Sequence, residues 1–408
     1  MKTLLRLTAS TAMTLSLGVS AFGQHYTQTN LVSNTSGVAP VTDPQLVNPW
    51  GLSRGSNGDW WVSDNLTGVS TLYNGAGTKN TLIVTIPPAN PSNKKTPIGS
   101  PTGTIFNGSQ TDFLLAPGLA AEFIFCTNDG SIAAWNANVG IAKGAVAPST
   151  HAETVATTND GSSYTGLASA TIEGRRYLYA ANFNKGTIDV YDNAFHRVHL
   201  RANEEQGNYD PFNSSEDQYS NGNRPFVDDR LPRDFVPFNV QTIGNDIVVT
   251  YVLHQKGQQL ETDGPGLGYV DIYNSSGELL RRLEHGDWLN APWGVALAPD
   301  DFGKFSHHLL IGQFAGGSAT QNSGVIAAYD LVTGKFDGLL EDASGKPLAI
   351  PGIWAISPGN VAPGNADAAA APAQQLYFTQ VTVSGGNPGG LFGYLTPVST
   401  ELIQGNDQ

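Results

Sequence analysis

The sequence predicts an all-β protein, a six-bladed β-propeller of four-stranded blades closed by an N-terminal strand, and three observations lead to this fold. The chain of 408 residues is rich in turn formers, with 47 Gly and 24 Pro, while only 14% of its residues are charged. Two sequence patterns then recur in a fixed order along the chain. Many short strands joined by tight turns and repeated at a regular interval are typical of propellers.

The first pattern opens each repeat and is best preserved as Asn–Pro–Trp–Gly. Its six copies are "NPWGLS" (48–53), "SPTGTI" (100–105), "SYTGLA" (163–168), "VPFNVQ" (236–241), "APWGVA" (291–296) and "IPGIWA" (350–355). Their shared position falls at Gly51, Gly103, Gly166, Asn239, Gly294 and Ile353. Five repeats separate residues 51 and 353, which sets the period at about 60 residues. We predict that each copy is the innermost strand of a blade and that the Trp and Pro side chains fill the narrow centre.

The second pattern closes a later strand of each repeat with an aromatic residue. These strands are "VSTLYN" (69–74), "SIAAWN" (131–136), "TIDVYD" (187–192), "YVDIYN" (269–274), "VIAAYD" (325–330) and "LFGYLT" (391–396). Between the two patterns lies an apolar run closing on a polar residue: "WWVSDN", "FIFCTND", "YLYAAN", "DIVVTY", "HLLIGQF" and "LYFTQV". The fixed order of these signals predicts three consecutive strands in each blade, followed by a fourth, outer strand.

Closure of the ring is the next requirement. A small sheet of four strands has two apolar faces and cannot bury both alone, whereas blades in a ring cover one another and protect their strand edges. The ring closes only if the two ends of the chain meet. We predict that "YTQTNLVSN" (26–34) supplies the outer strand of the last blade, with "VSTELI" (398–403) as the competing segment.

Residues 1–23 are predicted to be a signal peptide that is cleaved near Gly23 and Gln24. Two basic residues precede an apolar run there, and small residues precede the expected cleavage site. Residues 24–408 then form a single propeller domain. Three longer connections are predicted as loop insertions: 201–235, 253–268 and 360–375. Since no later stretch reaches the roughly 20 apolar residues of a spanning helix, we expect an exported protein, periplasmic or extracellular, without a membrane span.

Charge and cysteine content exclude some classes of partner and of stabilisation. The formal net charge of −14 argues against nucleic-acid partners, which bind to basic patches. The acidic balance is compatible with cation binding, and equally with simple solubility. Cys126 is the only cysteine, so no disulfide can form within the chain and stability depends on burial.

The order of these signals resembles six-bladed propellers of the NHL-repeat and gluconolactonase-like kind. Three longer strings resemble more closely an uncharacterised family of exported bacterial propellers: "LPRDFVPFNVQTIGNDIVVTY", "LNAPWGVALAPDDFGKFSHHLLIGQF" and "GGLFGYLTP". Some members of that family carry a C-terminal PEP-CTERM tail, which the ending "ELIQGNDQ" does not match. The resemblance covers nearly the whole chain after the leader. It implies a fold and an export route, and no established activity.

Polar residues at the ends of the second strands and at the starts of the inner strands are the candidate binding site. Closure of the ring would place them on one rim around the central channel. The rim and ligand-binding candidates are Asn48, Trp50, Asn65, Asn182, Asn239, Asn290, Trp293, Gln313 and Gln380. Asn side chains also cap turns, and Trp side chains also form cores, so a structural role is the alternative.

A ring of amide and carboxylate oxygens is suited to Ca²⁺ or another divalent cation. The metal candidates are Asp64, Asn128, Asn182 and Asn239. The gluconolactonase-like resemblance implies one divalent ion at such a rim, but Asn48 stands where that pattern expects a Glu. The catalytic candidates are Asp64 or Asp129 as a base, and His254, which lies near the predicted channel mouth.

Three functions of different class follow from these features. The first is a binding or interaction module whose rim recognises a glycan, a peptide, a small molecule or an envelope protein. The second is a divalent-metal-dependent hydrolase or lactonase that acts at the channel mouth. The third is a structural protein of the cell envelope. Because propellers host many functions, the fold does not choose among these three.

Overall fold

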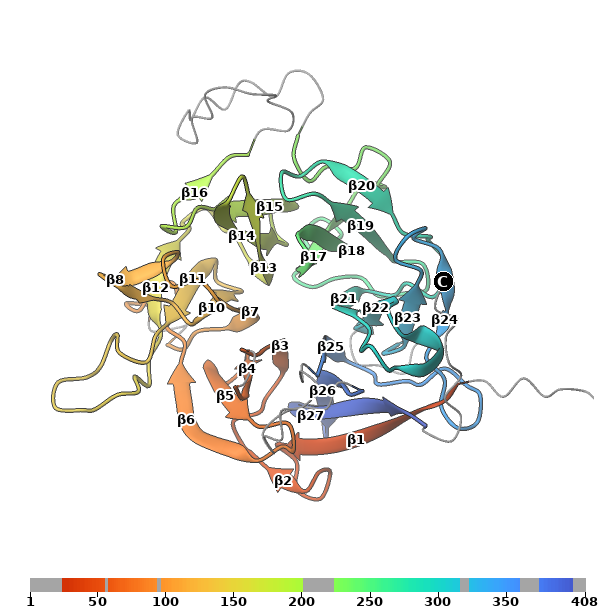
Figure 1. The fold of residues 1–408 in the computed structure, drawn as a ribbon, viewed down its shortest axis with the longest axis horizontal. Helices are drawn as coiled ribbons and strands as arrows, with labels where there is room; N and C mark the ends of the chain where they lie inside the picture. Colours follow the sequence, from red (N-terminus) through yellow and green to blue (C-terminus); the bar gives the residue numbers. More distant parts are fainter. Residues whose placement is uncertain are drawn as a thin grey trace, which may run out of the picture.

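The computed structural model describes residues 24–55, 58–93, 97–200, 224–315, 323–359 and 374–398, and the predicted signal peptide lies outside these ranges. The described chain forms a ring of six antiparallel blades around a central axis (Figure 1). The predicted six-bladed, all-β propeller is therefore confirmed. No α-helix occurs in the described ranges, and none of their helical turns is long and apolar enough to cross a membrane.

Blades 1 to 3 each contain four strands, which follow one another from the channel outwards. Blade 1 contains β3 (Pro49–Ser53), β4 (Trp60–Asp64), β5 (Val69–Tyr73) and β6 (Lys79–Thr85). Blade 2 contains β7 (Pro101–Phe106), β10 (Phe123–Thr127), β11 (Ser131–Trp135) and β12 (Glu153–Thr157), with a small hairpin of β8 (Leu114–Ala116) and β9 (Leu119–Ala120) beside it. Blade 3 contains β13 (Tyr164–Ile172), β14 (Arg175–Asn182), β15 (Thr187–Tyr191) and β16 (Arg197–Val198).

Blades 4 to 6 repeat this arrangement. Blade 4 contains β17 (Phe235–Ile243), β18 (Asp246–Leu253), β19 (Gly268–Tyr273) and β20 (Leu279–Arg282). Blade 5 contains β21 (Pro292–Leu297), β22 (Leu309–Gln313), β23 (Ile326–Tyr329) and β24 (Phe336–Leu339), with the short 3₁₀ turn η2 (Gly303–Phe305) between β21 and β22. Blade 6 contains β25 (Ile353–Pro358), β26 (Leu376–Ser384), β27 (Asn387–Pro397), β1 (Tyr26–Ser33) and the two-residue β2 (Val41–Thr42).

The ring closes as predicted, through the N-terminal segment. β1 pairs antiparallel with β27 and so becomes an outer strand of blade 6. Val32 is fully buried there, and the ring of Tyr26 lies 4.7 Å from the ring of Phe302. The Tyr26 hydroxyl donates a hydrogen bond of 2.9 Å to the Phe302 carbonyl oxygen. The competing segment, 398–403, lies almost wholly outside the described residues.

Small residues in the first pattern allow neighbouring inner strands to approach closely. A Cβ atom added at Gly51 would lie 2.4 Å from the carbonyl oxygen of Thr102 in blade 2. One added at Gly103 would lie 2.4 Å from the backbone nitrogen of Leu167 in blade 3. Since the neighbouring atoms belong to backbone, they cannot move aside, and this close approach explains the recurring glycine.

The predicted alignment of the sixth repeat is wrong by two residues. Ile353 pairs with Gln380 at the start of blade 6, as Pro49 pairs with Asp64 at the start of blade 1. Ile353 is therefore the equivalent of the proline in Asn–Pro–Trp–Gly. It follows that Trp354 is the equivalent of the tryptophan, which gives the channel a third tryptophan at this level.

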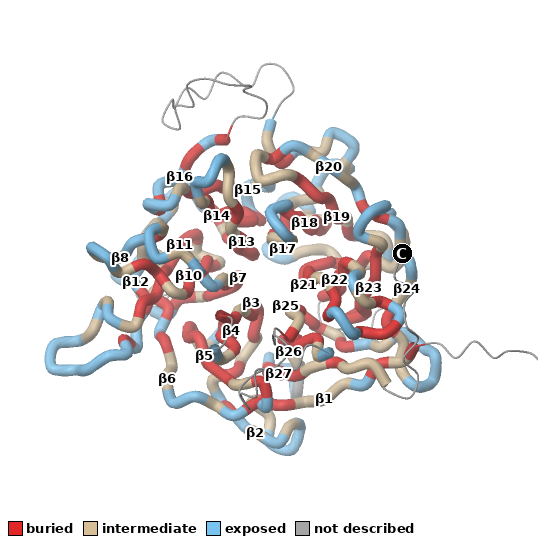
Figure 2. Tube along the Cα trace, viewed as in Figure 1, coloured by how far each residue is buried: buried red, intermediate tan, exposed pale blue. Residues whose placement is uncertain are grey.

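Burial follows the distance of a strand from the axis (Figure 2). Residues of the inner three strands are mostly buried, since each blade packs between two neighbours. The outer strands alternate between half-buried and exposed residues, as in β12 and β20. Of the predicted insertions, 253–268 is described and joins β18 to β19, whereas residues 201–223 and 360–373 lie outside the described ranges.

Candidate functional site

An aromatic plug fills the channel at the end where the inner strands begin, which we call the N-terminal mouth. The plug consists of Trp50, Phe238, Trp293, Phe314 and Trp354, which belong to one buried cluster. The ring of Trp354 stacks between those of Trp50 and Phe314, with centroid distances of 3.6 and 3.7 Å. Trp50 is the most exposed of the three tryptophans, at 8%. The prediction that tryptophans fill the narrow centre is confirmed.

Hydrogen bonds fix the orientation of the plug. The Trp293 indole N–H donates to the Thr165 carbonyl oxygen at 3.0 Å, and this bond joins blade 5 to blade 3 past the intervening blade. The Trp354 indole N–H donates to Asn48 Oδ1, also at 3.0 Å. Blades 2 and 3 carry the small residues Thr102 and Thr165 at the level of the plug, which leaves room for the large rings of the other blades.

Three of the predicted rim residues form a chain of amides around part of this mouth. Asn48 Nδ2 donates to Asn65 Oδ1 at 3.2 Å, and Asn65 Nδ2 donates to Asn128 Oδ1 at 2.8 Å. Asn65 Nδ2 also lies within 3.2 Å of the Pro101 carbonyl oxygen. Together with the Trp354 bond, the chain connects blades 6, 1 and 2. The structure therefore brings these residues together, with their oxygens accepting bonds from other side chains.

The other predicted rim amides do not join this chain. Their bonds are Asn239 Nδ2 to Trp293 O at 2.7 Å, Gly264 N to Asn290 Oδ1 at 2.8 Å, Asn290 N to Gln313 Oε1 at 2.9 Å and Gln380 Nε2 to Pro351 O at 2.8 Å. Each of these bonds has a backbone group as one partner. Such bonds hold loops and neighbouring blades in place, which is the structural role expected as the alternative to ligand binding.

Asp64 is fully buried at the end of β4. Its Oδ2 accepts hydrogen bonds from the Thr71 backbone N–H at 3.1 Å and from the Thr71 hydroxyl at 2.7 Å, whereas its Oδ1 has no hydrogen-bond partner. Burial is the main cause that raises the pKa of Asp64 well above its usual value, and the two bonds from Thr71 oppose it. A buried carboxyl without a basic partner is more stable in its protonated form.

The raised pKa of Asp64 makes a testable prediction about stability. In the folded state the carboxyl keeps its proton to a higher pH than in the unfolded state, so this group stabilises the fold most below about pH 4 and loses that contribution as pH rises. We expect the Asp64→Asn variant to lack this slope, which amounts to about 1.4 kcal/mol for each pH unit over which the folded state alone holds the proton.

Urea denaturation at pH 5 and pH 8 measures this effect. The difference in the free energy of unfolding between the variant and the wild type should grow with pH. The exposed Asp300 provides a control, because Asp300→Asn should follow the wild-type curve. Parallel curves for Asp64→Asn and the wild type would show that Asp64 ionises normally in the folded protein.

The other two catalytic candidates also have local partners. Asp129 Oδ1 accepts a bond of 2.5 Å from the Thr127 hydroxyl, and its Oδ2 accepts one of 2.7 Å from the Ala89 backbone N–H. The ring of His254 stacks 4.2 Å from that of Phe183. The hydrogen bonds of Asp129 connect parts of blades 1 and 2, whereas His254 lies at the end of blade 4.

The predicted calcium site depends on oxygens that face a common centre. Among the described residues, no group of three or more His, Cys, Asp or Glu side chains could hold a metal ion. The side-chain oxygens of Asn128 and Asn182 accept hydrogen bonds from the protein itself. The arrangement of Asp64, Asn128, Asn182 and Asn239 thus does not resemble a calcium cage, and calcium binding stays a prediction.

Two acids of the 253–268 insertion also have altered pKa values. Burial raises the pKa of Glu261 to about 7 and that of Asp263 to about 6. The insertion is tied to the start of β21, because the Gly264 backbone N–H donates to Asn290 Oδ1. These acids therefore lie in the neighbourhood of the N-terminal mouth, where sequence reasoning did not single them out.

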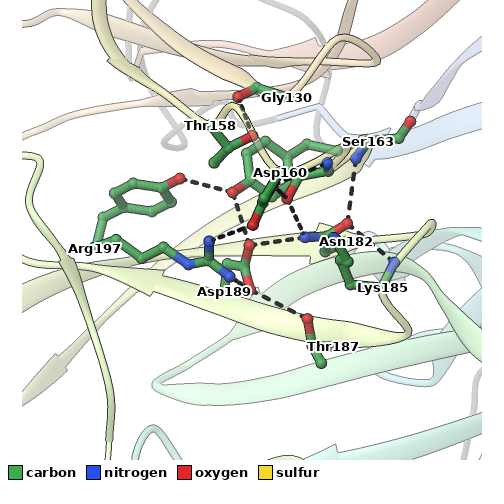
Figure 3. Close-up of polar contacts among 12 residues, drawn as sticks. Gly130, Thr158, Asp160, Ser163, Asn182, Lys185, Thr187, Asp189 and Arg197 are labelled. Carbon is green, nitrogen blue, oxygen red and sulfur yellow. Dashed lines mark hydrogen bonds and ion pairs between the residues drawn. The ribbon is translucent and has the colours of Figure 1, made fainter. Parts of the chain in front are cut away.

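A buried polar network in blade 3 contains the predicted residue Asn182 (Figure 3). Its centre is Asp189, which is 5% exposed and accepts hydrogen bonds from Asn182 Nδ2 at 2.9 Å and from the Tyr164 hydroxyl at 2.8 Å. Arg197 forms ion pairs with Asp189 at 2.8 Å and with Asp160 at 3.2 Å. Each of these three charged groups has a partner of opposite sign, so the network fastens the strands of blade 3 to one another.

The opposite end of the channel, the C-terminal mouth, is built differently. A cavity of about 250 Å³ lies where the inner strands of blades 1, 2, 3, 4 and 6 end. Its polar lining consists of Ser53, Arg54, Thr104, Ser169, Gln241, Thr242 and Ser357. A second cavity of about 20 Å³ lies deeper along the axis and reaches Trp293 of the plug. This deeper space is large enough for about one water molecule.

Arg54 is the charged residue of the C-terminal cavity. It is 9% exposed, and its guanidinium carbon lies 4.9 Å from the ring centroid of Trp60. Burial lowers the pKa of Arg54, although an arginine keeps its charge in proteins. Thr104, which is 8% exposed, lines both cavities, and its hydroxyl has no hydrogen-bond partner. A buried cation beside hydroxyl groups can hold an anionic or hydroxylated molecule.

Comparison with known proteins adds relatives but no activity. No family model matches the chain. It is 27% identical over 334 residues to the uncharacterized protein R648 of Acanthamoeba polyphaga mimivirus, with 80% of this chain and 72% of that protein covered. It is also 27% identical over 336 residues to the uncharacterized protein L690 of the same virus, with 80% and 77% covered.

Solved structures share the general fold at low sequence identity. A protein of unknown function from Bacteroides thetaiotaomicron is 11% identical, with a TM-score of 0.48 and coverage of 91% of this chain and 76% of that one. Virginiamycin B lyase from Staphylococcus aureus is 11% identical, with a TM-score of 0.41 and coverage of 92% and 100%. This chain is thus similar to uncharacterised viral proteins in sequence and to other propellers in fold.

Proposed function

We propose that the protein is an exported binding module that holds a small polar molecule in the C-terminal cavity. The observation that carries the proposal is a buried arginine, Arg54, in a polar cavity on the propeller axis. Concave sites with a few convergent polar groups are the usual places for ligands. Export is supported by the composition of residues 1–23.

The contrast between the two mouths supports the choice of this end. At the N-terminal mouth, aromatic rings stack across the channel and the amides of Asn48, Asn65 and Asn128 bond to one another. At the C-terminal mouth, the Thr104 hydroxyl has no hydrogen-bond partner. A ligand at the first mouth must displace existing bonds, whereas a ligand at the second can make new ones.

A thermal-shift screen of the mature protein against sugars, organic acids, short peptides and Ca²⁺ tests the proposal. A ligand at 100 times its Kd should stabilise the wild type by about 2.7 kcal/mol. Ser357→Trp places a large side chain in the cavity and should abolish the shift. Asn128→Ala, at the opposite mouth, is the matched control and should retain it. The reverse result for the two variants would move the site to the rim.

A structural role in the cell envelope is the second candidate, and one observation favours it. The rim amides bond to neighbouring blades and to backbone groups, as expected of residues that hold a scaffold together. If no compound of the screen stabilises the wild type, this second function is preferred.

A further inference from the structure

We infer that the ligand of the C-terminal cavity is a small hydroxylated carboxylic acid, an inference that rests on the proposed binding function. The charge of the cavity is the first reason. Arg54 is the only charged residue among the twelve described residues that line it, so the lining carries a positive charge in a chain whose net charge is −14. A planar guanidinium matches a carboxylate with two parallel hydrogen bonds.

The position of Arg54 favours such a pairing. Its guanidinium lies over the face of Trp60, which is 1% exposed and therefore rigid. Stacking on a fixed ring holds the plane of the guanidinium, so less freedom is lost when a carboxylate binds. A carboxylate in a site with few waters also interacts more strongly with the cation than it would at the protein surface.

The rest of the polar lining suits hydroxyl groups. Ser53, Ser169, Thr242 and Ser357 carry hydroxyls that both donate and accept, and Gln241 adds an amide. Thr242 donates to the Ser169 carbonyl oxygen at 2.7 Å, and its oxygen can still accept. The Thr104 hydroxyl, buried and without a partner, would gain its first hydrogen bond from a ligand hydroxyl.

The apolar part of the lining and the volume set the size of the ligand. Phe106 is 39% exposed and offers a ring face to the C–H groups of a polyol. A volume of about 250 Å³ lies below the roughly 300–1,000 Å³ of sites for drug-sized ligands. The cavity therefore fits a single sugar acid or a smaller hydroxy acid, and excludes a folded peptide or a long glycan.

Isothermal titration of the mature protein with matched pairs of probes tests the inference. Galacturonate and galactose share a ring and differ at one carbon, which is a carboxylate in the first and a hydroxymethyl group in the second. Glycerate and glycerol form a smaller pair. We expect at least one acid to bind, and its neutral partner to bind about 10- to 100-fold more weakly, the loss for one charge-assisted pair of hydrogen bonds.

Variants assign the effect to named groups. Arg54→Lys keeps the charge without the planar fork and should weaken binding of the acid about tenfold or more, and Arg54→Met should weaken it further. Thr104→Val should weaken binding while leaving the protein as stable as the wild type, because the lost hydroxyl has no partner. The exposed Arg175 gives the control variant Arg175→Met, which should bind as the wild type does. Melting curves establish that each variant is folded.

Different failures have different meanings. Equal affinity for an acid and its neutral partner, with no change in Arg54→Lys or Arg54→Met, overturns the carboxylate assignment and leaves a binding module for neutral polyols. Binding that survives Ser357→Trp and is lost in Asn128→Ala overturns the proposed site as well. If neither the acids nor their neutral partners bind to the wild type, the inference is wrong, and the wider screen decides the proposed function.

Discussion

Replacing Trp354 by alanine is expected to lower the free energy of unfolding by about 3–5 kcal/mol, the usual cost of removing a large buried aromatic side chain. Trp354 is 2% exposed and stacks between Trp50 and Phe314. It also donates a hydrogen bond to Asn48, so the variant loses a bond between blades 6 and 1. Urea denaturation followed by circular dichroism measures the change.

Val332 provides the control for this substitution. It is 77% exposed in the connection between β23 and β24, and Val332→Ala should change the free energy of unfolding by less than about 0.5 kcal/mol. Trp354→Phe should fall between the wild type and the alanine variant. A loss below about 1 kcal/mol in Trp354→Ala would contradict the plug as a main source of stability.

Deleting residues 24–33 from the mature chain is expected to have the largest effect of all. The deletion removes β1, exposes the edge of β27, and takes Tyr26 and Val32 out of the core. The expected loss exceeds about 5 kcal/mol, the lower end of the total stability of a domain. The truncated chain should therefore lack a cooperative thermal transition and should aggregate through the open strand edge.

Calorimetry and size-exclusion chromatography of the truncated chain test this prediction. Adding a synthetic peptide of residues 24–34 should restore part of the transition, whereas a scrambled peptide should not. A truncated monomer that melts as the wild type does would show that the ring does not depend on its N-terminal strand.

Much of the fold was predictable because its signals repeat. Every blade carries the same order of inner, second and third strands, and the aromatic residue that closes the third strand is buried in most copies, as with Tyr73 and Tyr191. The outer strands had no comparable signature. β16 contains only Arg197 and Val198, and β20 alternates half-buried and exposed residues, so their composition does not distinguish them from loops.

The sixth repeat shows how a local likeness misleads. The segment "IPGIWA" contains a Pro–Gly pair, which resembles the Pro and Gly of the other copies, but this pair forms the turn before β25. The strand begins at Ile353, opposite Gln380. Pairing register depends on a partner far along the chain, and a sequence pattern of six residues does not contain it.

The candidate site was predictable only in part. The sequence identified amides at strand ends, and the structure brings Asn48, Asn65 and Asn128 together. It did not show that their oxygens accept bonds from neighbouring blades. Arg54 was missed because one arginine after "NPWGLS" resembles a surface residue. The available signal was its spacing of two from Leu52, a residue that also lines the cavity.

A crystal structure of the mature protein with its tightest-binding hydroxy acid is the decisive measurement for a ligand site at the C-terminal mouth. We predict a ligand there with its carboxylate on Arg54 and a hydroxyl within hydrogen-bond distance of Thr104, and with the aromatic plug unchanged. A ligand or a metal ion bound instead to the amides of Asn48, Asn65 and Asn128 would contradict this site.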